Sequence, residues 1–197
     1  MPRSKTLSDE QVLDAAARVL LRLGPARFTL ADVAAEAGLA PATLLQRFGS
    51  KRGLLLAFAR SAAASARMPF ELARREKSSP LAALQLALVS ACSELSSRQE
   101  VANSLALLLD DLTDEDMRAA AVAHARATES SIRELLDAAV TAGELRKTDT
   151  VELALSVQAA FNGALIQWAL RGSGKFDSFL GRVLAPLLPR QGKKRES

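Results

Sequence analysis

The sequence predicts an all-α protein. Alanine and leucine, both strong helix formers, account for 72 of the 197 residues, as 38 Ala and 34 Leu. Against them stand 10 valines and 2 isoleucines, and the chain has no tyrosine. Strands draw on β-branched and aromatic residues, so this composition disfavours a sheet-based fold. Apolar residues at helical spacing, interrupted by Gly and Pro, divide the chain into about nine helices.

The first three predicted helices are closely spaced and cover residues 7–24, 29–37 and 41–48. Each begins at a residue suited to a helix N-terminus and ends at a glycine. The paired start and stop residues are Ser8 with Gly24, Thr29 with Gly38, and Pro41 with Gly49.

The second and third of these helices have the spacing of a helix-turn-helix. Ala34 is small enough to let two helices approach closely, and Gly38 permits a positive φ in the turn between them. A generic helical hairpin has the same pattern. From these two residues alone, both interpretations stay open.

The rest of the chain is expected to form six further helices. Proline, glycine and serine mark several of the breaks between them. The segment from Asp110 to Thr113 marks another, and Thr113 is expected to cap the helix that follows it. The predicted ranges are 51–66, 80–97, 99–110, 114–142, 149–171 and 175–189. Residues 191–197 are expected to be a disordered basic tail.

Charge and rare residues narrow the function. Residues 1–60 carry 9 Lys/Arg and 5 Asp/Glu, whereas residues 61–190 carry 14 and 16. A basic first third is typical of a part that binds a polyanion, or of an ordinary solvated surface. A single histidine and a single cysteine, His124 and Cys92, cannot supply the usual zinc site, so no metal or cofactor is expected.

The expected location is the cytoplasm. One cysteine cannot form a disulfide within the chain, which favours a reducing compartment. The N-terminus lacks the apolar core of a signal peptide, and uninterrupted apolar runs are shorter than the roughly 18 residues of a membrane span. No membrane association is therefore expected.

Residues 28–58 resemble the DNA-binding domain of TetR-family transcriptional regulators. The segment from Phe28 to Lys51 reads FTLADVAAEAGLAPATLLQRFGSK, and an apolar helix follows from Leu54. The positions that carry the resemblance are Thr29, Ala34, Gly38, Thr43, Leu44, Phe48, Ser50 and Lys51. The resemblance implies a DNA-binding domain over 1–50 and a helical ligand-binding and dimerisation domain over 51–190. It further implies a homodimer on a palindromic operator, most often a repressor, that a small-molecule effector releases.

The third helix would then enter the major groove of double-stranded operator DNA. Its polar residues offer donors that suit base edges or phosphates, and the small residues at its start suit close approach. Lys51 lies at a helix N-terminus, where the helix dipole disfavours a cation unless a phosphate lies nearby. The predicted DNA-binding residues are Thr29, Pro41, Ala42, Thr43, Leu45, Gln46, Arg47 and Lys51.

Two of these positions depart from the family pattern. The family usually carries Tyr at the position of Leu45, where the phenol reaches the DNA backbone, and Gly at the position of Ala42. Leucine cannot donate a hydrogen bond, so Leu45 either contacts a thymine methyl or sugar, or only packs. Arg47 would replace the missing phosphate contact electrostatically.

The C-terminal half carries the predicted dimer and effector contacts. Apolar stripes on helices 149–171 and 175–189 suit either an intramolecular core or a four-helix bundle with a second subunit. The predicted dimer residues are Phe161, Leu165, Trp168, Phe176, Phe179, Leu180, Val183 and Leu187. Polar residues that interrupt apolar faces, with apolar walls beside them, are the candidates for an effector pocket. Charged residues are scarce among them, which favours an apolar or aromatic effector. These effector residues are Asn103, Leu109, Met117, His124, Gln158, Phe161 and Asn162.

Alternatives remain at several positions. His124 is also suited to a surface or to a satisfied core position, and Cys92 to a small buried hydrophobe rather than a redox sensor. A helical enzyme would need the carboxylates at Asp110, Asp111, Asp114 and Asp116, which helix capping explains equally well. A helical adaptor that retains the helix-turn-helix only as a scaffold is a third possibility. The leading prediction is a regulator that is not an enzyme.

Overall fold

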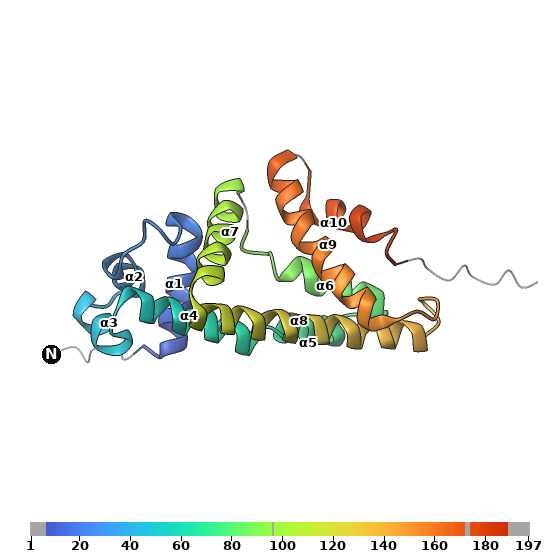
Figure 1. The fold of residues 1–197 in the computed structure, drawn as a ribbon, viewed down its shortest axis with the longest axis horizontal. Helices are drawn as coiled ribbons and strands as arrows, with labels where there is room; N and C mark the ends of the chain where they lie inside the picture. Colours follow the sequence, from blue (N-terminus) through green and yellow to red (C-terminus); the bar gives the residue numbers. More distant parts are fainter. Residues whose placement is uncertain (1–6, 96, 172–173, 189–197) are drawn as a thin grey trace, which may run out of the picture. The chain divides into compact units, whose positions relative to one another are not determined.

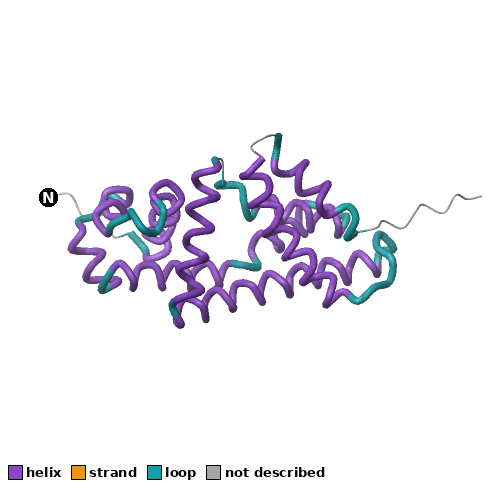
Figure 2. The backbone as a smooth tube through the Cα atoms, turned by 45° about the horizontal axis from the view of Figure 1, so that its top comes forward, coloured by secondary structure: helices purple, strands orange, loops and turns teal. Residues whose placement is uncertain are grey.

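The computed structural model describes residues 7–95, 97–171 and 174–188. The elements in these residues are α-helices joined by turns and short loops (Figures 1 and 2), which confirms the all-α prediction. The predicted basic tail, 191–197, lies outside the described residues. The ten helices within these described ranges are α1 (Asp9–Leu23), α2 (Leu30–Ala37), α3 (Pro41–Phe48), α4 (Lys51–Ser65), α5 (Met68–Glu76), α6 (Pro80–Ser90), α7 (Arg98–Thr113), α8 (Glu115–Thr141), α9 (Thr150–Arg171) and α10 (Phe176–Leu184).

The described residues pack as two compact units. The first contains residues 7–65 and 97–124, and the second contains residues 66–95 and the described residues from 125 onward. The long helix α8 therefore contributes its first turns to one unit and the remainder to the other. The predicted DNA-binding domain lies within the first unit, and the functional boundary at residue 50 stays a prediction.

The first unit is built from α1 to α4, α7 and the start of α8. The predicted capping box begins α1. The backbone N–H of Gln11 donates to Ser8 Oγ over 3.2 Å, and the backbone N–H of Ser8 donates to Gln11 Oε1 over 3.0 Å. The unit has its own apolar core. The buried members of that core are Val12, Ala16, Val19, Leu20, Phe28, Val33, Ala34, Leu44, Leu54, Leu55 and Met117.

The second unit is built from α5, α6, the later turns of α8, α9 and α10. Leucines of α6 and α8 form its centre, and the aromatic residues of α9 and α10 pack around them. The Phe176 ring meets the rings of Phe161 and Trp168 edge to face, with centroids 6.2 and 5.6 Å away. These contacts join α10 to α9 within one chain.

Among the helices of the described residues, α5 alone was not predicted from the sequence. Pro69 looked like a break between helices, yet it is the second residue of α5, where a missing backbone N–H costs nothing. Glu134 of α8 accepts from Arg74 of α5 over 2.9 Å and also contacts Arg67, the residue directly before α5. The helix is stabilised by tertiary contacts that no local pattern reveals.

Several helix ends also differ from the prediction. Helix α7 continues to Thr113 instead of ending at residue 110, and α6 and α10 end earlier, at Ser90 and Leu184. Asp114 caps α8, because its carboxylate accepts from the N–H groups of Asp116 and Met117 over 3.1 and 3.2 Å, whereas the predicted cap Thr113 is the last residue of α7. A one-residue junction therefore separates α7 from α8, where the sequence suggested a loop.

Candidate nucleic-acid interface

A glycine turn joins α2 to α3 as the sequence predicts. Gly38 has φ of 68° and ψ of 33°, the left-handed conformation that ends a helix. Its N–H donates to the carbonyls of Ala34 and Ala35, and the Leu39 N–H donates to Ala34 over 2.8 Å. Ala34 is fully buried where the two helices meet. The segment α2–turn–α3 is therefore a helix-turn-helix.

Helix α3 presents one face to solvent. Leu44 is fully buried in the first unit's core and anchors the helix, while Thr43 is half-buried beside it. The Leu45 side chain is 53% exposed, which leaves an apolar surface where hydrocarbon or a thymine methyl can be contacted. The exposed residues of the predicted contact set on α3 are Pro41, Ala42, Leu45 and Gln46.

Thr29 begins α2 with both of its donors engaged. Its N–H and its hydroxyl donate to Asp32 Oδ2 over 2.8 and 2.7 Å, and the Asp32 N–H donates back to the Thr29 hydroxyl. These hydrogen bonds from Thr29 hold the pKa of Asp32 below its usual value, so Asp32 is ionised at neutral pH. A phosphate at Thr29 would have to displace this carboxylate.

Lys51 is partly accommodated without DNA. Its Nζ lies 4.4 Å from the centroid of the Phe28 ring and donates to the carbonyl of Ala26 over 3.4 Å. These contacts offset the unfavourable position of a cation at the N-terminus of α4. Since an ammonium group has three donors, two remain for a phosphate.

Arg47 is the predicted contact most fully engaged within the protein. Its Nε donates to Asp9 Oδ1 over 2.7 Å, its Nη2 also contacts Asp9, and its Nη1 donates to the Leu7 carbonyl over 3.0 Å. The side chain is 23% exposed. The guanidinium therefore bridges α3 to the start of α1.

The same pattern extends to other arginines of the first unit. Arg18 and Arg22 both pair with Glu36, over 2.9 and 3.2 Å. Arg52 donates to Asp114 and Asp116 over 2.7 Å each, and the Arg52 guanidinium holds the pKa of Asp114 below its usual value. Glu36 is already counted among the five acidic residues of the first 60, whereas Asp114 and Asp116 lie outside them and offset part of the basic excess. This excess is a weaker sign of a polyanion partner than the residue count suggested.

Gly53 is a structural requirement that the sequence analysis missed. A Cβ atom at this position would overlap the backbone carbonyl oxygen of Phe48. The first turn of α4 therefore approaches the end of α3 more closely than any side chain allows. Ser50 stabilises the start of α4 at the same junction, because its hydroxyl accepts from the Gly53 N–H over 2.9 Å.

The predicted dimer residues lie largely inside the second unit. Phe179 and Leu180 are buried in its core, and others of the set, among them Trp168 and Val183, pack against it half-buried. The strongly exposed apolar side chains of α9 form a different set on another side of the helix. This set, named here the α9 apolar face, consists of Val151, Leu155, Ile166 and Leu170, which are 44%, 54%, 40% and 71% exposed.

The α9 apolar face also explains why α9 resembles a membrane span. Among the described helices, α9 alone is long and apolar enough to cross a membrane. Its opposite side is nevertheless part of the second unit's core, through Ala154, Val157 and Ala164. A core helix with one uncovered apolar side has the same composition as a membrane span.

The predicted effector residues are divided between the two units. Asn103 is buried in the first unit, where its Nδ2 donates to the Leu21 carbonyl over 2.7 Å, and Met117 belongs to the same unit's core. Leu109 and His124 are exposed residues of that unit. The second unit holds Gln158, Phe161 and Asn162.

Gln158 has an unsatisfied polar atom, and so does a neighbour in α8. The Gln158 Nε2 donates to the Ala125 carbonyl over 3.3 Å, but its Oε1 is buried without a partner in the described structure. The Thr128 hydroxyl, one turn after Ala125, is buried and equally unpaired. Buried polar groups without partners cost free energy that a ligand or water would relieve.

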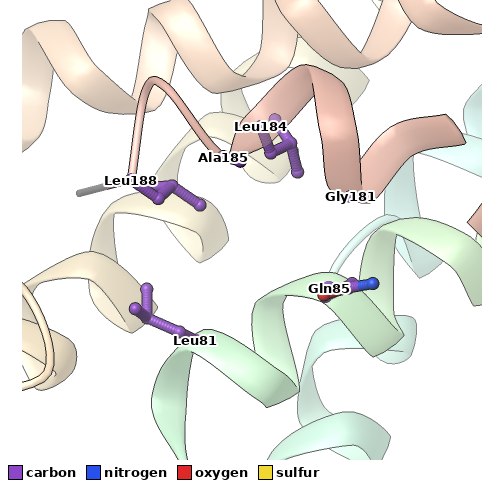
Figure 3. A pocket seen from close by; sticks show the side chains of 6 residues that line it. All are labelled: Leu81, Gln85, Gly181, Leu184, Ala185 and Leu188. Carbon is purple, nitrogen blue, oxygen red and sulfur yellow. The ribbon is translucent and has the colours of Figure 1, made fainter. Parts of the chain in front are cut away.

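The second unit also contains a cavity of about 280 Å³ between α6 and α10 (Figure 3). Leu81 and Leu188 point into the same space, and the Gln85 side chain is the polar group at its edge. The Gln85 amide is held by Asp177, to which it donates over 2.7 Å. None of its lining residues is among the predicted effector residues. They are Leu81, Gln85, Gly181, Leu184, Ala185 and Leu188.

Cys92 is a buried thiol of the second unit. Burial raises its pKa to about 12, so it carries its proton at neutral pH. A protonated, buried thiol is a poor nucleophile. The packing role of Cys92 is therefore favoured over redox sensing.

Comparison with known proteins places the helix-turn-helix in a family. Residues 12–58 match the model of the bacterial regulatory proteins of the tetR family. These residues run from α1 into α4 and so contain the whole α2–turn–α3 segment. A search of curated proteins finds no significant match.

Solved structures share the fold over nearly the whole chain. A regulatory protein TetR from Rhodobacter sphaeroides has a TM-score of 0.76 at 19% identity, covering 93% of this chain and 100% of that one. A TetR transcription regulator from Haloarcula marismortui ATCC 43049 also reaches 0.76, at 16% identity, over 93% and 98%. The transcriptional regulator FadR from Bacillus subtilis, solved with stearoyl-CoA, reaches 0.70 at 16% identity, over 92% and 98%. Residues 12–58 are thus similar to the tetR family of bacterial regulatory proteins, and the chain as a whole shares its fold with these solved structures.

Proposed function

We propose that the protein is a cytoplasmic homodimeric repressor that binds a palindromic operator and is released by a small-molecule effector. In this proposal α3 of each subunit enters the major groove, at half-sites about one duplex turn, ~34 Å, or somewhat more apart. The observation that carries the proposal is the exposed side of α3. It is held by the buried Leu44 on a helix-turn-helix of the TetR family.

Within this interface the predicted contacts have different tasks. Gln46 is exposed and carries an amide that can pair with adenine, while Pro41, Ala42 and Leu45 supply apolar contact. Thr43, half-buried on the same helix, has a hydroxyl suited to a base edge or a phosphate. Lys51 supplies a phosphate contact from the start of α4, because two of its donors are free of carbonyl contact.

The α9 apolar face supports the homodimer. Four large apolar side chains on one side of a 22-residue helix are a costly surface to leave in water. A second copy of α9, related by a twofold axis, would bury them against themselves. The predicted dimer helices are kept in this proposal, but the contact surface moves from the core side of α9 to its exposed side.

The second unit supports an apolar effector with a polar group. Gln158 and Thr128 have a buried acceptor and a buried hydroxyl to pair, and three of the six residues that line the cavity between α6 and α10 are leucines. At about 280 Å³ this cavity suits a small ligand. A structural neighbour binds stearoyl-CoA. An acyl chain is therefore the first effector class to test.

Selection of DNA by the purified protein tests the proposal. The protein is mixed with a pool of randomised duplexes, bound duplexes are enriched, and affinity for the enriched sequence is measured at several salt concentrations. The proposal predicts an inverted-repeat consensus and an affinity that falls with salt, because lysine–phosphate contacts release counterions. A pool that stays random after enrichment would refute operator recognition.

The effector part is tested on the same complex. Acyl-CoA compounds of increasing chain length are titrated into the protein bound to its enriched duplex. Release by one chain length, lost in Gln158→Leu, supports the predicted polar anchor. Release that is lost in Leu81→Trp but kept in Gln158→Leu would place the effector in the cavity between α6 and α10 instead.

A further inference from the structure

Arg47 differs from the other predicted DNA contacts because its guanidinium already forms several hydrogen bonds within the protein. Three of its five N–H donors meet acceptors at the start of α1: the Asp9 carboxylate and the Leu7 carbonyl. The guanidinium also lies 5.8 Å from the centroid of the neighbouring Phe48 ring. With these donors engaged, the guanidinium is poorly placed to donate two parallel hydrogen bonds to the edge of a guanine base.

The bridge connects segments that are far apart in the sequence and otherwise weakly joined. Arg47 lies in the last turn of α3, whereas Asp9 is the first residue of α1, 38 positions earlier. Helix α3 has eight residues, and Leu44 is its single fully buried one. Phe48, in the same last turn as Arg47, also packs half-buried against this core. Because a helix this short has few core contacts to fix its direction, a bridge at its C-terminal end adds substantially to them.

The acceptors are themselves well fixed. Ser8, between Leu7 and Asp9, is the N-cap of α1 and is locked by the capping box with Gln11. Leu7 packs against the first unit's core. The Arg47 side chain therefore ties the C-terminal end of α3 to acceptors that the capping box and core packing hold in place.

We infer that Arg47 is a positioning residue, which fixes the orientation of α3 through Asp9 and Leu7 instead of reading bases. This inference rests on the proposed DNA-binding function for its consequence in operator affinity. It assigns sequence recognition on α3 to Gln46 and Thr43. It also gives Asp9 a role: the pair is neutral, so the carboxylate at the start of α1 does not repel phosphate.

The two roles of Arg47 predict opposite effects for Asp9→Ala. If Arg47 contacted DNA, removal of its carboxylate partner would free a cation and leave binding equal or stronger. If Arg47 positions α3, the same change weakens binding, although it makes the surface more positive. Positioning also requires the planar fork, so Arg47→Lys should behave like Arg47→Ala, whereas a phosphate contact tolerates lysine.

The first measurement is the affinity of the full-length protein for the duplex enriched by the unaltered chain. We expect Asp9→Ala, Arg47→Ala and Arg47→Lys each to weaken binding on the order of tenfold, with no change in the preferred bases. The salt slope of a dimer should stay nearly constant in Arg47→Ala. A loss of about 0.9 per subunit in that slope, or tighter binding by Asp9→Ala, would overturn the inference.

The second measurement does not require DNA. Hydrogen exchange of the amides at the end of α3, including the Gly49 N–H bonded to Leu45, reports how firmly this turn is held. We expect exchange there to rise about fivefold in Asp9→Ala and in Arg47→Ala, and no further in the double variant. Unchanged exchange in either single variant would refute the positioning role, whatever the protein binds.

Glu10→Ala is the matched control. Glu10 is the other acidic residue in the first turn of α1, and it is exposed. Its removal changes the charge and the helix-dipole interaction of α1 as Asp9→Ala does, but leaves the bridge to Arg47 intact. Exchange in α3 should stay at its original rate in this variant. An equal rise in Glu10→Ala would show that α1 stability, and not the bridge, controls α3.

Discussion

The Asn103 side chain of α7 donates a 2.7 Å hydrogen bond to the carbonyl oxygen of Leu21 near the end of α1. Its Oδ1 accepts from Gln99 over 3.0 Å, so both ends of the amide are paired. The residue is 8% exposed. Asn103, which the sequence suggested as an effector contact, therefore joins α7 to α1 through a buried hydrogen bond within the first unit.

Asn103→Ala should destabilise the first unit. The change leaves the Leu21 carbonyl buried without this partner, which costs about 1–3 kcal/mol. Thermal unfolding of the purified protein measures the loss, and Asn162→Ala, at an exposed position of α9, is the control. An unchanged Tm for Asn103→Ala would contradict this structural role. If that variant also lost its response to the effector, Asn103 would be an effector contact, as the sequence suggested.

Gly53→Ala should disturb the junction of α3 and α4. The added methyl group overlaps the Phe48 carbonyl, and the backbone has to move to relieve it, at a cost of about 1–3 kcal/mol. Gly163→Ala provides a matched control, because a Cβ there meets nothing within 4 Å and α9 is a helix. The control should gain up to about 1 kcal/mol. Chemical denaturation of both variants gives the comparison, and equal stabilities would disprove the close approach.

A charge on the α9 apolar face should separate the subunits. Leu155→Lys places an ammonium group in the surface that the proposed dimer buries, and a buried unpaired charge is strongly unfavourable. Light scattering should report half the mass of the unaltered protein, with the helical content retained. Leu72→Lys, at a leucine of α5 that is 55% exposed, should leave the mass unchanged. A dimeric Leu155→Lys protein would place the interface elsewhere.

Stability should fall in acid through the carboxylates that the arginines hold. The pKa values of Glu36 and Asp114 are lowered in the folded protein by their arginine partners, so the folded state binds protons less readily than the unfolded state. Their contribution is complete above the unfolded pKa, near 4, and is lost as the pH falls below it. Arg52→Ala should make the free energy of unfolding fall less steeply with decreasing pH. An equally steep fall in this variant would show that the Arg52–Asp114 pair does not contribute to it.

Local signals in the sequence predicted the features that depend on near neighbours. The capping boxes at Ser8 and Thr29 join residues three positions apart, and the Gly38 turn needs only the conformational freedom of glycine. Helix α5 was missed because Pro69 satisfies the rule for a break and the rule for a first turn equally.

Features that depend on distant residues could not be predicted from one sequence. Arg47 meets Asp9 across 38 positions, and Asn103 meets Leu21 across 82. Nothing local distinguishes an arginine that reads DNA from one that bridges two helices, or an amide that meets a ligand from one that meets a carbonyl. Likewise, both sides of α9 are apolar, so only the packed structure separates the core side from the α9 apolar face.

The most direct test of the account is the base preference of Gln46→Ala beside Lys51→Ala, measured on the enriched duplex and its single-base variants. The account predicts that Gln46→Ala loses preference at one position of each half-site, by about 1–3 kcal/mol. Lys51→Ala should weaken all duplexes alike and reduce the salt slope by about 0.9 per subunit. If neither variant differs from Lys77→Ala, an exposed lysine of the second unit, the side chains of α3 and α4 do not recognise DNA.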